Sequence, residues 1–194
     1  MREQMGILEH LRQGYKSNSS ELLNYWINYS HLGTWQFWLC AAILIVPLIV
    51  VYLYIDRGKA FHIGFFGFNV HTWFSHIDTY GVLHGLWEYP YQVIPFTPVS
   101  FMLDVSLVPV SYMLVYQWAI NHGRSRYLFL TLLSAGFAFV FKPIMTSIGL
   151  FKLHEWMNYL LLFCGYMVIM LVSVWITVFF QRLQQTSPPK FLRK

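Results

Sequence analysis

Charged side chains are scarce in this chain of 194 residues. They make up 11% of it, whereas 57% of the residues are hydrophobic and 20% are aromatic. Because a soluble domain carries roughly 25% charged residues, this deficit excludes an ordinary soluble domain and indicates an integral membrane protein. The basic residues flank apolar runs, so we assign the net charge of +5 to orientation in a lipid bilayer and expect no nucleic-acid partner.

Cysteine is rare in the sequence, and the common catalytic motifs do not occur in it. The only cysteines, Cys40 and Cys164, each lie in an apolar run, which favours small buried hydrophobic residues over a disulfide framework or a metal knuckle. HExxH, CxxC, GxSxG and P-loop patterns do not occur, which removes the common hydrolase and nucleotide-binding classes. We also expect no cleavable signal peptide, because a polar stretch precedes the first apolar run near Trp35 and no small-residue cleavage site follows that run.

Five apolar segments are each long enough to cross a bilayer, which requires roughly 20 residues. They predict an all-α fold, a polytopic membrane helical bundle of about five transmembrane helices within residues 34–181. The expected spans are residues 35–54, 61–83, 99–120, 127–151 and 156–180.

The two ends of the chain differ from this bundle. Residues 1–33 are polar and aromatic, and Asn18 with Glu21 three residues later predicts the start of a short helix at the membrane surface. A loosely ordered tail is the alternative for this segment. Residues 182–194 are rich in Lys and Arg, and we expect them to form a basic cytoplasmic tail.

The distribution of basic residues predicts an orientation. With five spans, the loops after the first and third spans and the C-terminal tail share one side, and together they hold most of the basic residues. The positive-inside rule therefore predicts an outside N-terminus and a cytoplasmic C-terminus in the cell membrane.

Ionisable residues within the spans mark the candidate site, because such groups are costly in a bilayer and are often functional. At about 1.5 Å rise per residue, Asp78 and Asp104 fall roughly 8 Å below the outer surface and Lys142 about 13 Å below it. His71 lies near the midplane. We therefore predict a ligand or ion pocket in the outer half of the bundle, formed by His71, Asp78, Asp104 and Lys142. Its predicted mouth consists of His84, Glu88, His154 and Glu155 in the outer loops.

Each pairing within this set has two interpretations. Asp104 and Lys142 can form a structural ion pair or a functional gate for a proton or substrate. His71 and Asp78 are seven residues apart and share a helix face, so they can form an oriented general base, or His71 can simply hydrogen-bond within the bundle.

Metal and haem sites are less well supported, and the cofactors stay open. His84 and Glu88 are four residues apart and have the chemistry of zinc ligands. Their aromatic surroundings favour an anchoring role at the membrane interface instead. A transmembrane b-type haem is disfavoured, because it needs two histidines on facing helices and only His71 lies deep in a span.

Three stretches carry a resemblance to known proteins. At HIGFFGFNVHTWFS, GVLHGLWEYPYQVIPF and PVSFMLD the chain resembles a family of small, uncharacterised multi-pass membrane proteins from spore-forming Gram-positive bacteria. The likeness covers about residues 25–180. It implies a Gram-positive plasma membrane and transfers no catalytic residue.

Three functions are compatible with these features. The first is binding or transport of a small ligand or ion; five spans without an inverted repeat would then require a homo-oligomer. The second is a non-catalytic subunit or sensor of a membrane complex, whose polar groups hold helices together. The third is an intramembrane enzyme acting on a lipid or isoprenoid-like substrate, with His71 and Asp78 as acid and base and aromatic residues holding an apolar chain or a cationic intermediate.

Overall fold

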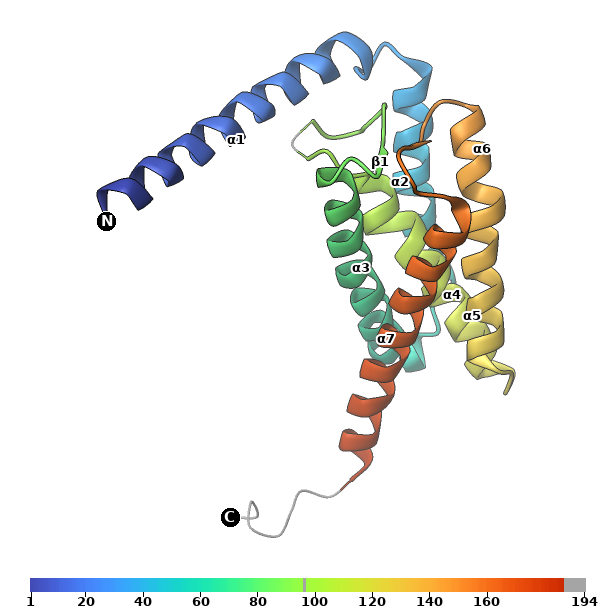
Figure 1. Ribbon diagram of the computed structural model, residues 1–194. Coiled ribbons are helices and arrows are strands. Elements are labelled where there is room, and N and C mark those ends of the chain that lie inside the picture. The colour runs from blue at the N-terminus through green and yellow to red at the C-terminus, as the bar shows by residue number, and fades with distance from the viewer. Residues whose placement is uncertain (96, 187–194) are drawn as a thin grey trace.

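The chain folds as an all-α helical bundle, as its apolar segments predict (Figure 1). The computed structural model describes residues 1–95 and 97–186. Its elements are α1 (Arg2–Tyr29), α2 (Trp35–Tyr54), the 3-10 turn η1 (Arg57–Lys59), α3 (Ala60–Leu83), β1 (Trp87–Glu88), the π-helical turn η2 (Leu103–Leu107), α4 (Val108–Asn121), α5 (Arg126–Gly136), the π-helical turn η3 (Phe137–Phe141), α6 (Lys142–Ser147), β2 (Lys152–Leu153) and α7 (Tyr159–Gln185).

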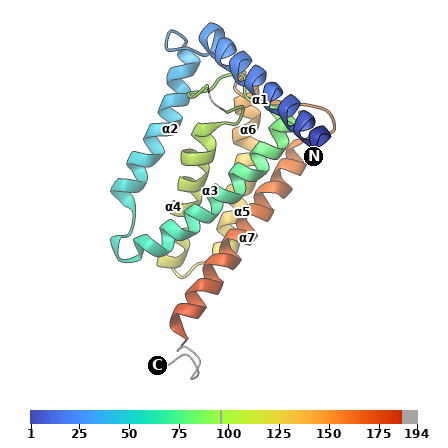
Figure 2. The ribbon, with the colours of Figure 1, turned by 90° about the vertical axis from the view of Figure 1, so that its left-hand side faces the viewer.

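The chain is a multi-pass membrane protein. Within the residues that the structure describes, four helical segments are long and apolar enough to cross a membrane: Trp35–Tyr54, Leu103–Asn121, Arg126–Ser147 and Tyr159–Gln185. The 24-residue helix α3 is not among them, because it is less apolar, yet it has the length of a span. It packs mainly against α7 and α4 (Figure 2). The face that carries Asn69 and Asp78 is buried, whereas Phe61, Phe68 and Tyr80 are exposed.

The helix bounds follow the predicted spans closely at the start of the chain and less closely later. The first span coincides with α2. The last is shifted, because α7 begins at Tyr159 and continues to Gln185, so the first residues of the predicted basic tail are helical. Residues 187–194 of that tail lie outside the described residues.

The bundle has two chemically different ends. At one end, which we call the loop end, lie residues 30–34, 84–95, 97–100 and 148–158; at the other, the basic end, lie residues 55–59 and 122–125. At the loop end β1 pairs antiparallel with β2, with Trp87 opposite Leu153 and Glu88 opposite Lys152. This short ladder joins two connections that are more than 60 residues apart in sequence.

The N-terminal segment is one long helix rather than a short one. α1 begins at Arg2, runs through Asn18 without interruption and has no buried residue. It leaves the bundle at the loop end and projects to one side (Figure 1). Its C-terminus is tied down, because Trp26 Nε1 donates to the carbonyl oxygen of Gln92 at 2.9 Å. A position at the membrane surface stays a prediction for this helix.

Two π-helical turns precede prolines in the middle of spans. Val108 N–H bonds to Leu103 O, and Lys142 N–H bonds to Phe137 O, so each reaches back five residues instead of four. Pro109 and Pro143 follow directly and lack an N–H. Turns of this kind often accompany functional sites. Here Asp104 lies within η2, and Lys142 directly follows η3.

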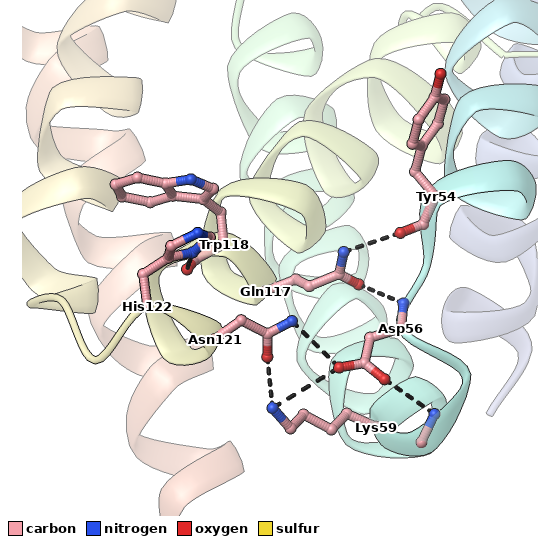
Figure 3. A network of polar contacts seen from close by, with 8 residues as sticks. Tyr54, Asp56, Lys59, Gln117, Trp118, Asn121 and His122 are labelled. Carbon is pink, nitrogen blue, oxygen red and sulfur yellow. Dashed lines mark hydrogen bonds and ion pairs between the residues drawn. The ribbon is translucent and has the colours of Figure 1, made fainter.

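The basic end is closed by a polar network between η1 and α4 (Figure 3). The Asp56 backbone N–H donates to Gln117 Oε1 at 2.7 Å, and the Asn121 side chain donates to Asp56 Oδ2 at 3.1 Å. Lys59 donates to Asn121 and lies 3.7 Å from the Asp56 carboxylate. The Asn121 hydrogen bond, with help from Lys59, lowers the pKa of Asp56. These contacts fix the turn from which α3 enters the bundle.

Candidate functional site

Asp78 on α3 is the centre of a buried hydrogen-bond network near the loop end. It is 3% exposed. Its Oδ1 accepts from Trp87 Nε1 at 2.9 Å and from the Tyr89 hydroxyl at 2.6 Å, and its Oδ2 accepts from the Ser100 backbone N–H at 3.5 Å. These donors replace the water that a carboxyl group loses on burial.

Lys142 reaches the same network from α6. It is 2% exposed, and its Nζ donates to the Tyr89 hydroxyl oxygen at 2.9 Å. The Tyr89 hydroxyl therefore accepts from Lys142 and donates to Asp78, which links the three side chains in series. The Lys142 ammonium also lies 3.7 Å from the centre of the Phe151 ring and 4.7 Å from that of Tyr89, in range for cation–π attraction.

A turn after α3 brings Trp87 back onto the helix. Gly85 has a φ of 68°, which glycine adopts without strain, and the Leu86 N–H donates to Gly81 O at 2.9 Å. This closes the helix C-terminus in the usual glycine-dependent way. The chain folds back so closely that an added Cβ on Gly81 would lie 2.0 Å from the Trp87 ring. The tight contact aims the indole N–H at Asp78.

Asp104 lies in η2 beside this network and is 3% exposed. Its carboxyl group is close enough to the Asp78 carboxyl group and to the Lys142 ammonium group for electrostatic interaction. Its Oδ1 has no hydrogen-bond partner among the described residues. A direct ion pair between Asp104 and Lys142 is not formed: in the part of the chain described, no Lys142 nitrogen lies within 4.0 Å of a carboxylate oxygen. The Tyr89 hydroxyl takes the direct contact with Lys142 instead.

His71 is engaged by the backbone rather than by Asp78. Its Nδ1 lies 2.7 Å from the carbonyl oxygen of Asp104. Because a carbonyl can only accept, Nδ1 carries the proton. This carbonyl is available because Pro109, five residues later, has no N–H to donate to it. The His71–Asp78 pair expected for a general base is therefore not formed. The contacts fit the alternative, in which His71 hydrogen-bonds within the bundle.

A cavity of about 230 Å³ opens beside the network between α3 and α7. Asp78, Tyr89 and Lys142 line it, but His71 and Asp104 do not. Most of the remaining lining is aromatic or aliphatic, and its rim includes the exposed Trp156. The other aromatic residues on its wall are Phe74, Trp87 and Tyr166.

The predicted mouth residues lie at the loop end but do not line this cavity. His84 is exposed and bonds to Tyr80 O through Nδ1 at 2.8 Å. Glu88 lies 3.4 Å from the Lys152 ammonium and 3.2 Å from His154 Nε2. Glu155 is exposed, with a φ of 53°. The α6–α7 connection contributes Trp156 and Met157 to the lining, whereas β1–β2 pairing places Glu88 opposite Lys152.

The contacts of His84 and Glu88 do not support a metal site shared by these two residues. The two side chains take separate partners, Tyr80 and the Lys152–His154 pair. Among residues 1–95 and 97–186, no group of three or more His, Cys, Asp or Glu side chains is placed to hold a metal ion.

Trp87, Tyr89 and Ser100 are the site residues that the sequence pattern did not reveal. By composition, Trp87 and Tyr89 are typical of aromatic anchors at the membrane interface, whereas Ser100 falls within a predicted span. A usable signal did exist. A buried Asp needs donors, a buried Trp or Tyr needs a partner for its polar atom, and Trp87 follows Asp78 by only nine residues with two glycines between.

Replacement of Tyr89 by phenylalanine is expected to destabilise the protein by roughly 1–3 kcal/mol, because it leaves Lys142 and Asp78 each without one buried hydrogen bond. The ring contacts with Phe151 and the Lys142 ammonium are retained. Thermal unfolding in detergent, followed by circular dichroism, measures the change. The matched control is Tyr80→Phe, at an exposed position on α3, where we expect less than about 0.5 kcal/mol. Equal effects of the two variants would contradict the role given to the Tyr89 hydroxyl.

Comparisons with models of protein families, with curated proteins and with solved structures find no match to this chain. The geometry of the site is therefore the basis for a functional proposal. The resemblance to a Gram-positive membrane protein family stays a prediction.

Proposed function

We propose that this membrane protein binds a small lipophilic organic cation in the cavity between α3 and α7. The observation that carries the proposal is a buried carboxyl group in the wall of an aromatic cavity: Asp78 lines the cavity and is 3% exposed. Lys142 reaches Asp78 only through the Tyr89 hydroxyl group. A cation in the cavity supplies the direct positively charged partner that a buried carboxylate favours.

The walls of the cavity suit such a ligand. Aromatic ring faces attract organic cations, and several rings around one cation form the usual recognition cage for ammonium groups. The cavity has Trp87, Tyr89 and Tyr166 on its wall and Trp156 at its rim, and Asp78 lines it directly. An apolar body on the same ligand fits the aliphatic part of the lining from α7, which includes Leu162 and Ile169.

The geometry supports binding better than the two alternatives. An intramembrane enzyme would need an acid–base pair, and His71 donates to a backbone carbonyl rather than to Asp78. A purely structural cluster in a non-catalytic subunit would not need an open cavity at its side, nor a carboxyl group with an unpartnered oxygen such as that of Asp104 within the described chain. Transport of the bound cation is a further step of the same proposal.

We also propose that the protein lies in the plasma membrane with the loop end outside. The connections at residues 55–59 and 122–125 contain Arg57, Lys59 and Arg124. Arg126 begins α5 and Arg182 lies in the last turn of α7, both at the same end. The positive-inside rule assigns such an end to the cytoplasm. The cavity then opens toward the outer half of the bilayer.

Three probes that differ only in the charge of the head group test the proposal: hexyltrimethylammonium, hexanol and hexanoate. We expect the ammonium probe to bind the detergent-solubilised protein at least about tenfold more tightly than hexanol, which corresponds to about 1.4 kcal/mol, and hexanoate to bind most weakly. Isothermal titration calorimetry measures the three affinities. Equal affinity for the three probes, or a preference for hexanoate, would overturn the proposal.

Two variants locate the site. Gly165 on α7 lines the cavity, and a Cβ there meets no atom within 4 Å, so Gly165→Leu should occupy the cavity and weaken binding of the ammonium probe. Gly136→Leu is the matched control, because Gly136 also has free space but lies on α5 away from the lining. Asp78→Asn replaces the carboxyl group in the cavity wall by an amide of the same size, and it should abolish the preference for the ammonium probe over hexanol. Unchanged binding to Gly165→Leu would place the site elsewhere.

A further inference from the structure

A second cavity lies at the basic end, far from the aromatic cavity. It has a volume of about 710 Å³ and is lined by η1, the start of α3, the end of α4, the start of α5 and the end of α7. Lys59, His62 and Arg126 line it together with glutamines of α7. No Asp or Glu occurs among its described lining residues. The cavity is therefore suited to an anion.

Arg126 is the most available cation in this cavity. Lys59 already contacts Asn121 and the Asp56 carboxylate. Arg126 makes no ion pair within the described part of the chain, and its guanidinium lies 5.6 Å from the centre of the Tyr127 ring. A guanidinium presents five N–H donors in a fixed fork that matches the oxygens of a phosphate group.

An apolar groove continues from this cavity along the bundle. It has a volume of about 490 Å³ and shares Phe61, His62 and two glutamines of α7 with the basic cavity. Phe65, Phe180 and Leu183 complete its apolar surface. Phe61 is 90% exposed and Phe180 is 54% exposed, on helices that lie within the bilayer. Basic and apolar parts thus adjoin in the order of a phospholipid head group and its chain.

We infer that this groove binds an anionic phospholipid, with the phosphate at Arg126 and Lys59 and an acyl chain along Phe61 and Phe180. Basic pockets between transmembrane helices at a positively charged end recognise such head groups. The cavity lies where head groups of the adjacent leaflet are found, because it is at the ends of α3 and α7. The inference does not depend on the proposed cation site.

The test is lipid retention by the full-length protein in native mass spectrometry. Purified protein in detergent is incubated with dioleoyl phosphatidylglycerol or with dioleoyl phosphatidylcholine, which has the same chains and no net charge. We expect the wild-type protein to retain phosphatidylglycerol in preference to phosphatidylcholine. Arg126→Gln should reduce retention of phosphatidylglycerol about fivefold, the effect of one basic residue near an anionic lipid. Equal retention of the two lipids by the wild-type protein would overturn the inference.

Arg124→Gln is the matched control, because Arg124 lies two residues earlier in the same basic connection but does not line the cavity. We expect its retention of phosphatidylglycerol to stay within about twofold of the wild-type value. If Arg124→Gln and Arg126→Gln have equal effects, general surface charge explains the retention and the site is refuted. If Arg126→Gln does not fold, Gln184→Glu on α7 replaces it. That variant puts a carboxylate where the cavity and groove meet and should also weaken retention.

A competition distinguishes a lipid from a free anion. Inorganic phosphate at the same concentration is added to the complex with phosphatidylglycerol. We expect no displacement, because phosphate has no chain to occupy the apolar groove. Displacement by phosphate alone would show a site for a soluble anion and contradict the lipid assignment.

Discussion

Replacement of Lys142 by methionine is expected to destabilise the protein by about 3–5 kcal/mol, the usual cost of removing one partner from a buried charged pair. Lys142 is 2% exposed and is the only cation in the cluster with Asp78 and Asp104 among the described residues. Its loss removes the ammonium group that faces two buried carboxyl groups and leaves the Tyr89 hydroxyl without its donor. Thermal unfolding in detergent measures the destabilisation. Lys59→Met, at a site that is 47% exposed and paired with Asp56, is the control and should cost no more than about 1 kcal/mol.

A second substitution identifies the carboxyl group that Lys142 balances. In Asp78→Asn combined with Lys142→Met, the carboxyl group that lost its cation is also removed, and we expect part of the lost stability to be recovered. The contacts place Asp78 one hydroxyl group from Lys142, whereas Asp104 makes no such contact. Double-mutant cycles should therefore give a larger coupling energy for Lys142 with Asp78 than with Asp104. The reverse order would contradict the Lys142–Tyr89–Asp78 series.

The Gly81→Ala variant is expected to lose roughly 2–5 kcal/mol of stability, from overpacking and from loss of a buried hydrogen bond to a carboxylate. The new Cβ would lie 2.0–2.4 Å from three atoms of the Trp87 ring. Trp87 is buried and rigid, so it must move away, and its Nε1 then leaves Asp78. Near-ultraviolet circular dichroism reports the changed indole environment, and thermal unfolding gives the stability.

Two other glycines make this prediction specific. Gly165→Ala meets no atom within 4 Å and should be neutral or stabilise α7 by up to about 1 kcal/mol, since alanine favours helix. Gly67→Ala would contact Met113 at 2.3 Å, but methionine is flexible and can move, so we expect a smaller cost than at Gly81. A neutral Gly81→Ala would show that Trp87 is not held tightly against α3.

The sequence by itself determined the class of protein, its helical fold and the bounds of its first span. Runs of apolar residues must bury their backbone polar groups in helices when they cross a bilayer, so the length of each run predicts a span. For this reason α2 coincides with its predicted range. The polar helix α3 was also predictable, because a helix carrying His71 and Asp78 has to be covered by protein.

The partners of the ionisable residues were decided only by the tertiary structure. Depth along a helix placed Asp78, Asp104 and Lys142 in the same half of the bundle, but depth does not say which side chain contacts Lys142. Tyr89 makes that contact and links Lys142 to Asp78, because Gly85 and β1 fold the loop back onto α3. His71 contacts the Asp104 carbonyl because η2 and Pro109 leave it free. Such contacts depend on turns and on backbone groups at chosen points, and helical periodicity contains no information about either.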